Sequence, residues 1–302
     1  MLSRKFNFLK ILFFIRILVN ARVWIPPKKW EMFYRLSSLR WQRCQELPRL
    51  RDSPNMNDMI LFSALFWHNR DMSAFTDKIQ VRDFIQDAIG SSYLSNVTQV
   101  AESIDDIDFA AARGKWIKSN NGSGFNVFHD GVLSDFEIKK RLSRSTQPYG
   151  VAHGEYVYRF IKPKFFVESP VQGLSNSRLI EFKGFFHFGK LLGIWLKTGR
   201  GNVVLSPDLE LDFEDLSNGN TLNQSLNVSE ILDASVMNEA IELGVNCTKS
   251  FHFVRFDLYI ISKKILFQEL TFLPGAGAVK RKSNLGSFAL EVAPKMYQKP
   301  KK

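Results

Sequence analysis

Cysteine is almost absent from the sequence, since Cys44 and Cys247 are the only two among 302 residues. Two thiols are too few for a disulfide framework, and their spacing matches no metal-binding motif. The chain therefore lacks the features of a small secreted domain, and we expect it to work in a reducing, cytoplasmic compartment. Its hydrophobic residues, 45% of the total, suffice for one large or two ordinary folded domains.

A hydrophobic run long enough to cross a membrane is also missing from the N-terminus. The run from Phe6 to Val19 contains Lys10 and Arg16, and it falls short of the roughly 20 apolar residues that a membrane span needs. No small-residue cleavage site follows it, as a signal peptide would require. Apolar bulk beside lysine and arginine is typical of a helix lying on an anionic membrane surface, and it equally fits a helix that packs on the protein body.

Positive charge is concentrated at the two ends of the chain. The net charge is +11, and residues 1–51 contribute +10 while residues 280–302 contribute +6. The stretch between them therefore carries −5. No known nucleic-acid-binding motif accompanies the basic residues, so we expect no nucleic-acid partner.

The order of apolar patterns predicts an α+β fold with mostly antiparallel strands. Thr76 is expected to cap one helix, and a later helix is expected to run from a Ser229 cap to Gly244. Between these helices, a hairpin is predicted to turn near Gly189. The polar stretch 206–229 is predicted to be a loop or a mobile insertion.

A second predicted hairpin, near the C-terminus, carries two acids. If its loop consists of residues 262–264, Asp257 lies opposite Glu269, and Arg255 lies opposite Thr271. Directly opposed residues have Cβ atoms roughly 4.5 to 5.5 Å apart, and two carboxylates at that distance repel unless a positive group lies between them. Mg²⁺ would serve, Arg255 could neutralise one acid instead, and a third alternative is that both acids face water.

A Gly/Ser-rich turn offers backbone groups to a phosphate. In the segment KSNNGSG, Lys118 precedes the turn from Asn120 to Gly124, and glycines let amide groups approach phosphate oxygens closely. The segment is not a Walker loop, because a strand follows where a helix should begin. An ordinary hairpin turn explains it equally well. Glu168, at the end of a later strand, belongs either to a nucleotide pocket or to the solvent-facing surface.

Taken in order, these segments resemble a known family. The segments TDKIQVRDFI, KSNNGSG, EFKGFFHFGK and VRFDLY with FQELTFLPGAG are similar to motifs of the TupA-like ATP-grasp proteins of bacterial surface-polysaccharide loci. The resemblance covers about residues 55–288. It implies an ATP-grasp fold with flanking helices. The composition of the two ends indicates a basic amphipathic helix in a membrane-associating segment at 1–54 and a basic tail at 289–302.

The resemblance also implies roles for individual residues. Lys118 and Arg255 would be catalytic, with Arg255 holding the transferred phosphoryl group or the oxyanion of an acyl phosphate. The residues implied to bind ATP are Lys78, Lys118, Asn120, Gly122, Ser123, Gly124, Glu168, Val171 and Lys183. Those implied to bind Mg²⁺ are Asp257, Glu269 and Thr271. Thr271 stands where ligases of this type usually carry Asn.

Enzymes of this kind activate a carboxylate with ATP, and an amine then attacks the acyl phosphate. The resemblance therefore implies ATP and Mg²⁺ as cofactors, with a carboxylate-bearing glycan or its precursor and an amine donor as substrates. Positioning and charge neutralisation matter more than a strong base in such chemistry. Two alternatives are a sugar phosphotransferase and a weakly active nucleotide-binding partner of glycosyltransferases. The expected location is cytoplasmic, on the inner face of the cell membrane.

Overall fold

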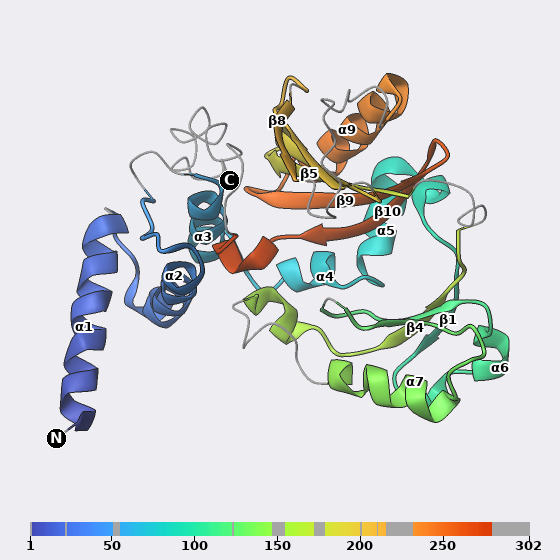
Figure 1. The fold of residues 1–302 in the computed structure, drawn as a ribbon, viewed down its shortest axis with the longest axis horizontal. Coiled ribbons are helices and arrows are strands. Elements are labelled where there is room, and N and C mark those ends of the chain that lie inside the picture. The colour runs from blue at the N-terminus through green and yellow to red at the C-terminus, as the bar shows by residue number, and fades with distance from the viewer. Residues whose placement is uncertain are drawn as a thin grey trace.

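Two antiparallel sheets and a group of N-terminal helices make up the fold (Figure 1). The computed structural model describes residues 2–21, 23–50, 55–122, 124–146, 155–171, 179–199, 201–209, 211–215 and 232–279. Mixed helices and antiparallel strands confirm the predicted α+β class. Within these residues, no helix is both long and apolar enough to cross a membrane.

The helices differ in length and in how they begin. The described α-helices are α1 (Leu2–Ala21), α2 (Trp30–Cys44), α3 (Met56–Phe66), α4 (Met72–Thr76), α5 (Val81–Ile89), α6 (Phe109–Ala112), α7 (Asp135–Leu142) and α9 (Ala234–Thr248). Short 3-10 helices near the site are η1 (Pro27–Lys29), η5 (Tyr156–Phe160) and η6 (Pro274–Gly277). Helix α3 begins with a capping box, in which Asn55 and Asp58 each accept the other's backbone N–H.

The two sheets are built from different parts of the chain. The smaller has the order β1-β4-β2-β3, with β1 (Val97–Ala101), β2 (Trp116–Ser119), β3 (Asn126–Phe128) and β4 (Phe165–Glu168). The larger has the order β10-β9-β5-β6-β7-β8, with β5 (Ile180–His187), β6 (Lys190–Thr198), β7 (Gly201–Leu205), β8 (Leu211–Asp215), β9 (Val254–Ile261) and β10 (Lys264–Thr271). The predicted turn near Gly189 is confirmed, whereas the predicted loop after residue 206 contains edge strand β8.

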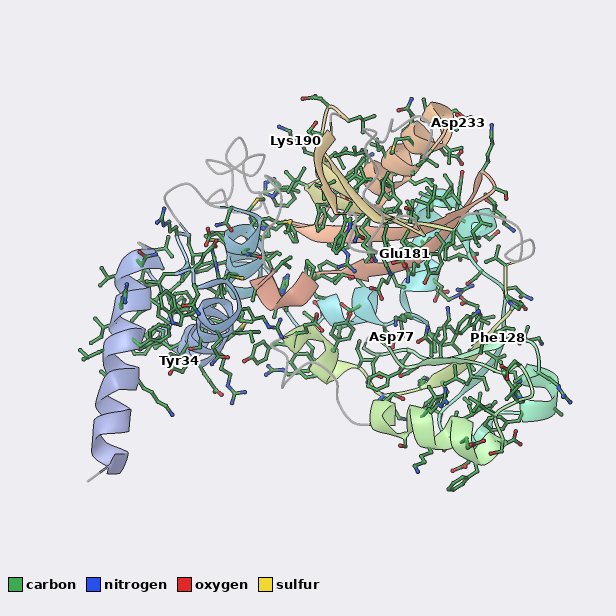
Figure 2. The ribbon with its side chains drawn as sticks, viewed as in Figure 1. Tyr34, Asp77, Phe128, Glu181, Lys190 and Asp233 are labelled. Atoms are coloured by element: carbon green, nitrogen blue, oxygen red, sulfur yellow. The ribbon has the colours of Figure 1, made fainter. Side chains whose placement is uncertain are left out.

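The buried apolar residues form three clusters, which correspond to the three groups of densely packed side chains in Figure 2. One joins the N-terminal helices to the end of the larger sheet, and one lies between the smaller sheet and helices α6 and α7. The third lies between the larger sheet and helices α5 and α9. Since these two helices cover one face of the larger sheet, its other face is left for the site.

The start and end predicted for helix α9 are wrong in detail. Its N-cap is Asp233, whose side chain accepts the amide of Ser235, while the predicted cap Ser229 lies outside the described residues. The predicted stop, Gly244, lies inside the helix, which continues to Thr248. A Cβ at Gly244 would lie 2.3 Å from the buried ring of Phe186, so glycine is needed here for close packing rather than for ending the helix.

Thr76 also differs from its predicted role as a helix cap. Its hydroxyl donates to the carbonyl of Met72, one turn back in α4. The next residue, Asp77, accepts the amides of Ile79 and Gln80 and so supports the turn that leads into α5. A carboxylate accepts two amides better than a single hydroxyl can, which explains why the role falls to Asp77.

The acidic hairpin of β9 and β10 has the predicted pairing around its acids but a different turn. Ile261 pairs with Lys264, so the turn consists of Ser262 and Lys263 alone, both with positive φ, and the predicted three-residue loop is wrong. A two-residue turn by itself would place Glu269 opposite Phe256, on the core face. A β-bulge between Phe267 and Glu269 shifts the register by one residue, which turns Glu269 toward Asp257.

Helix α1 packs on the protein body, which is one of the two alternatives left open by its sequence. Its inner side packs on α2, where Phe14 contacts the rings of Trp30 and Tyr34 and where Ile17 is fully buried. The exposed side carries Ile11, Leu12, Ile15 and Val19, which are 54, 46, 50 and 71% exposed. Helix α2 is in turn fixed by the buried Arg40, which pairs with Asp58 of α3.

Candidate active site

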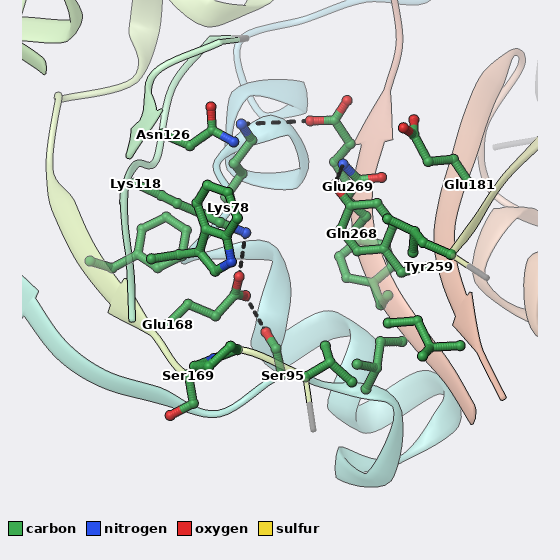
Figure 3. Close-up of a pocket in the computed structure, with 18 of the residues that line it drawn as sticks. Lys78, Ser95, Lys118, Asn126, Glu168, Ser169, Glu181, Tyr259, Gln268 and Glu269 are labelled. Carbon is green, nitrogen blue, oxygen red and sulfur yellow. Dashed lines mark hydrogen bonds and ion pairs between the residues drawn. The ribbon is translucent and has the colours of Figure 1, made fainter. Parts of the chain in front are cut away.

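A cleft of about 610 Å³ separates the two sheets (Figure 3). Lys118 and Glu168 lie on the wall formed by β2 and β4, and Tyr259 and Glu269 lie on the facing wall formed by β9 and β10. Its volume lies within the roughly 300 to 1,000 Å³ that small-molecule and cofactor sites occupy. Of the residues predicted to bind ATP, the cleft is lined by Lys78, Lys118, Gly124, Glu168, Val171 and Lys183.

Arg255 lies between the two acids of the hairpin. Its Nε and Nη2 atoms donate to the two carboxylate oxygens of Asp257, over 2.7 and 2.5 Å. The same Nη2 lies 3.4 Å from Glu269 Oε1 and 3.2 Å from the hydroxyl of Thr271. Of the alternatives that the sequence left open, neutralisation by Arg255 is therefore the arrangement observed, and Asp257 is fully buried rather than facing water.

The charges of this cluster stabilise one another against the effect of burial. Burial disfavours the charged form of Arg255, but Asp257 and Glu269 more than compensate and raise the pKa of the guanidinium above its ordinary value. Burial likewise disfavours the ionised form of Glu269, but Lys78, Arg255 and Lys183 lower the pKa of its carboxyl below the ordinary 4.5. We infer that Arg255 and Glu269 are both charged near neutral pH.

The donor set of this hairpin fits Mg²⁺. Asp257 and Glu269 offer carboxylate oxygens and Thr271 a hydroxyl, and hard cations prefer such oxygen ligands. Among the described residues, no three His, Cys, Asp or Glu side chains are grouped to hold a metal, so the protein would supply two carboxylates here. Mg²⁺ usually takes one or two carboxylates together with substrate phosphates, which matches this supply.

Two lysines approach the acids from neighbouring elements. Lys183 of β5 lies 3.4 Å from Asp257 and 3.0 Å from Glu181. Lys78, in the turn between α4 and α5, lies 3.7 Å from Glu269 and donates to the carbonyl of Gly122 over 2.7 Å. Figure 3 shows the Lys78 pair spanning the top of the cleft. Both ammonium groups therefore lie where phosphate oxygens of a nucleotide would need counter-charges.

The opposite wall holds an ion pair between Lys118 and Glu168. The hydroxyl of Ser95 donates to the same carboxylate (Figure 3). Arg82 in turn donates to the hydroxyl of Ser95 over 3.3 Å. Lys118 Nζ also lies 5.9 Å from the ring centroid of Trp116. A charged pair beside an aromatic ring suits a base that offers both donors and acceptors, as adenine does.

Asn120 does not line the cleft, although it was predicted to bind ATP. It is fully buried, and its side-chain amide donates to Asp77 and to the carbonyl of Lys162, while its side-chain oxygen accepts the amide of Lys164. These bonds fasten the start of the glycine-rich turn to the chain before β4. Gly122 also helps to hold this turn in place, because its carbonyl accepts a hydrogen bond from Lys78. Ser123 lies outside the described residues.

Several cleft residues were missed from the sequence. Trp116, Glu181 and Tyr259 line the cleft, and each lies two positions from a predicted residue in the same strand. Side chains alternate between faces, so this spacing could have identified all three. Gln268 could not have been found in this way, because it lies at the bulge. Its Nε2 donates to the hydroxyl of Tyr259 over 2.7 Å.

The glycines of η6 follow strand β10 and lie against helix α3. Gly275 and Gly277 have φ values of 56° and 65°, a region that side chains rarely adopt. Asn57 of α3 holds the following chain through two bonds to Val279, over 3.0 and 3.2 Å. The PGAG segment is therefore positioned by helix α3, well before it in the sequence.

A sequence profile described as TupA-like ATPgrasp matches residues 60–285. The chain belongs to the TupA-like ATP-grasp family. The match confirms the predicted family, the ATP-grasp fold and the expectation of an ATP-grasp enzyme. No curated protein was found to match the sequence.

Solved structures similar to this TupA-like chain include three ligases. The D-alanine–D-alanine ligase of Bacillus anthracis, complexed with ATP, is 13% identical with a TM-score of 0.37, covering 67% of this chain and 55% of that one. The D-alanine–D-alanine ligase of Helicobacter pylori is 14% identical with a TM-score of 0.42, covering 74% and 61%. The L-amino acid ligase of Bacillus licheniformis is 12% identical with a TM-score of 0.43, covering 82% and 57%. At these identities the likeness concerns the fold alone. The chain spans less than two thirds of each of these ligases.

Proposed function

We propose that the protein is an ATP- and Mg²⁺-dependent ligase that joins an amine to a carboxylate through an acyl phosphate. The observation that carries the proposal is the cleft in which Asp257 and Glu269 are surrounded by Arg255, Lys78 and Lys183. Such a cluster neutralises phosphate charge and needs neither a nucleophilic side chain nor a strong base.

The residues divide into a base-binding and a phosphate-binding group. Lys118, Glu168 and the backbone near Val171 would hold adenine and ribose, since they lie together on the wall away from the acids. Lys78 and Lys183 would contact phosphate oxygens. Mg²⁺, held by Asp257, Glu269 and Thr271, would supply charge neutralisation between the phosphates when bound.

The proposed reaction has two steps. An oxygen of the acceptor carboxylate attacks the γ-phosphorus of ATP, the bond to the bridging oxygen breaks, and ADP leaves. The amine nitrogen then attacks the carbonyl carbon of the acyl phosphate, the bond to the phosphate oxygen breaks, and the departing phosphate takes up the proton that the amine loses. Arg255 would exchange the carboxylates it now holds for the oxygens of the transferred phosphoryl group, where a buried guanidinium offers two parallel donors.

We further propose that the carboxylate belongs to a bacterial surface polysaccharide or its precursor, such as a uronic acid. The family match supports ATP-dependent ligation, and the polysaccharide is the substrate that the resemblance of the motifs implies. Exposed apolar residues of α1 support a location on the inner face of the cell membrane, because Ile11, Ile15 and Val19 form one side of a helix in a strongly basic segment.

The test is incubation of the protein with ATP, Mg²⁺, uronic-acid glycans and a mixture of amino acids, followed by mass spectrometry. ADP together with the mass gain of an amide supports the ligase. A phosphorylated sugar without amide contradicts it in favour of a phosphotransferase, and absence of nucleotide turnover would favour a nucleotide-binding partner of glycosyltransferases.

A further inference from the structure

A basic surface lies beside the cleft, outside the nucleotide site. It is formed by Lys28 and Lys29 of η1, Arg70 just before α4, and Arg159 and Phe160 of η5, and we call it the η5 surface. Figure 1 shows η5, in yellow-green, beneath η6 and between α2 and α4. Helix α4 packs against η5, so its segments form one continuous part of the fold.

Two arginines of the η5 surface are held in place by aromatic rings. The guanidinium carbon of Arg159 lies 4.5 Å from the ring centroid of Phe160 and 5.9 Å from that of Tyr156. The guanidinium carbon of Arg70 lies 5.7 Å from the same Phe160 ring. A guanidinium stacked on a ring has lost part of its freedom already, so it presents its donors to a carboxylate at a smaller entropic cost.

The positive charge of the η5 surface is not neutralised by its described surroundings. Lys28, Lys29, Arg70 and Arg159 form no ion pair with any described residue, whereas the neighbouring Arg35 is paired with Glu31 over 3.2 Å. Asp71 and Glu155 are the other acids near these cations in the sequence, and neither forms an ion pair with one of the four. Burial lowers the pKa of Lys29, and the nearby charges of Lys28 and Arg159 lower it further.

The η5 surface leads to the reacting end of the cleft. Tyr158 of η5 lies near Arg255, since it is among the groups that raise the pKa of that guanidinium, and α4 connects Arg70 with the turn that carries Lys78. The η5 surface therefore lies on the Arg255 side of the cleft and away from its nucleotide end, where Lys118 and Glu168 lie.

We propose that the η5 surface binds the acceptor, and that the acceptor is an acidic polysaccharide with several uronic-acid units. The proposal rests on the proposed function for the reaction itself. Several separate cations match a polymer that bears a carboxylate on successive sugars, since one carboxylate would engage only one or two of them. One unit of the polymer enters the cleft, and its neighbours occupy Arg70, Arg159 and the η1 lysines.

The test compares polygalacturonate binding by the wild type and by the double variant Arg70→Ala/Arg159→Ala. Removing two preorganised charge-assisted contacts should weaken binding about a hundredfold or more, since the loss of one such contact weakens binding about tenfold. The matched control is Lys249→Ala/Lys264→Ala, which removes two exposed charges at α9 and the hairpin turn and should bind as the wild type does. Circular dichroism and thermal melting check that the variants remain folded.

Unchanged polygalacturonate binding by the η5 variant would overturn the proposal, as would equal losses in the variant and the control. Tighter binding of polyglutamate than of polygalacturonate would identify an acidic peptide instead and also overturn it. ATP turnover with monomeric glucuronate and an amine separates this proposal from the proposed function. It should be the same in the variant and the wild type. A wild type that binds polygalacturonate through these arginines but turns over no ATP would contradict the ligase and leave the η5 surface standing.

Discussion

Replacing Arg255 by methionine should separate the two roles assigned to the acids of the hairpin. Methionine keeps much of the apolar volume of the side chain but removes the guanidinium that holds both oxygens of Asp257. The variant should be less stable than the wild type in the absence of divalent metal, and it should respond more strongly to Mg²⁺. The wild type should respond weakly, because Arg255 already occupies the oxygens that a cation needs.

The expected magnitude follows from the partners that remain. Removing one member of a buried ion pair costs about 3–5 kcal/mol. Asp257 keeps Lys183 at 3.4 Å and Glu269 keeps Lys78 at 3.7 Å, so we expect the lower end of that range. A loss of about 3 kcal/mol corresponds to a fall in Tm of roughly 6 to 12 °C, taking 2–4 °C per kcal/mol. Mg²⁺ at a concentration 100 times its Kd would restore about 2.7 kcal/mol.

The assay is thermal unfolding in EDTA and across a Mg²⁺ titration, without nucleotide. Arg255→Met/Asp257→Asn is the control, because it removes the guanidinium and one of the two carboxylates together. Its Tm should rise less with Mg²⁺ than that of Arg255→Met. An Arg255→Met protein that gains no more from Mg²⁺ than the wild type, or no more than the double variant, would refute the metal assignment.

Three further predictions concern the nucleotide, acid stability and the membrane. Lys118→Ala should raise the Kd for ATP, measured by calorimetry, by about tenfold or more, since a charge-assisted hydrogen bond contributes roughly 1.5–3 kcal/mol. An unaltered Kd would show that Lys118 and the KSNNGSG segment form an ordinary turn without a role in ATP binding. Burial lowers the pKa of His68 and His252 to about 3 from the ordinary 6.5, so the unfolded chain binds protons that the folded one does not. Stability should therefore fall as pH drops from 6.5 toward 3, by about 1.4 kcal/mol per pH unit for each histidine, and His252→Gln should flatten the slope seen in urea unfolding. Ile15→Glu/Val19→Glu should abolish co-sedimentation with anionic vesicles, whereas continued co-sedimentation would show that α1 is not the membrane contact.

The site could be predicted from sequence wherever alternation along a strand was enough. Arg255 and Asp257 share a face of β9, and Lys183 lies on the same side of neighbouring β5, as the pattern indicates. The same rule, applied two residues further, would have added Glu181 and Tyr259. The sequence placed Asn120 in the nucleotide site, but its side-chain amide donates to Asp77 and to the chain before β4 instead. No local sequence pattern reveals such contacts.

The hairpin shows how a correct pairing can follow from a wrong turn. The loop predicted as three residues has two, and the bulge at Gln268 restores the register that brings Glu269 opposite Asp257. Both differences are of one residue and they cancel. A bulge is decided by how the two faces of a strand pack on other elements, so the apolar pattern could not disclose it.

The sequence by itself determined the class of fold, the family, the strands and the charged residue types gathered in them, because alternation, turns and motif order are local properties. Tertiary structure decided which charges meet. It set Arg255 between the acids and turned Asn120 away from the cleft. It also brought Lys78, in the turn between α4 and α5, to Glu269 of β10, and it covered one side of α1 while leaving the other exposed. The physical reason is that each of these outcomes depends on contacts between segments far apart in the chain, whose packing and electrostatics act only once the sheets and helices have come together.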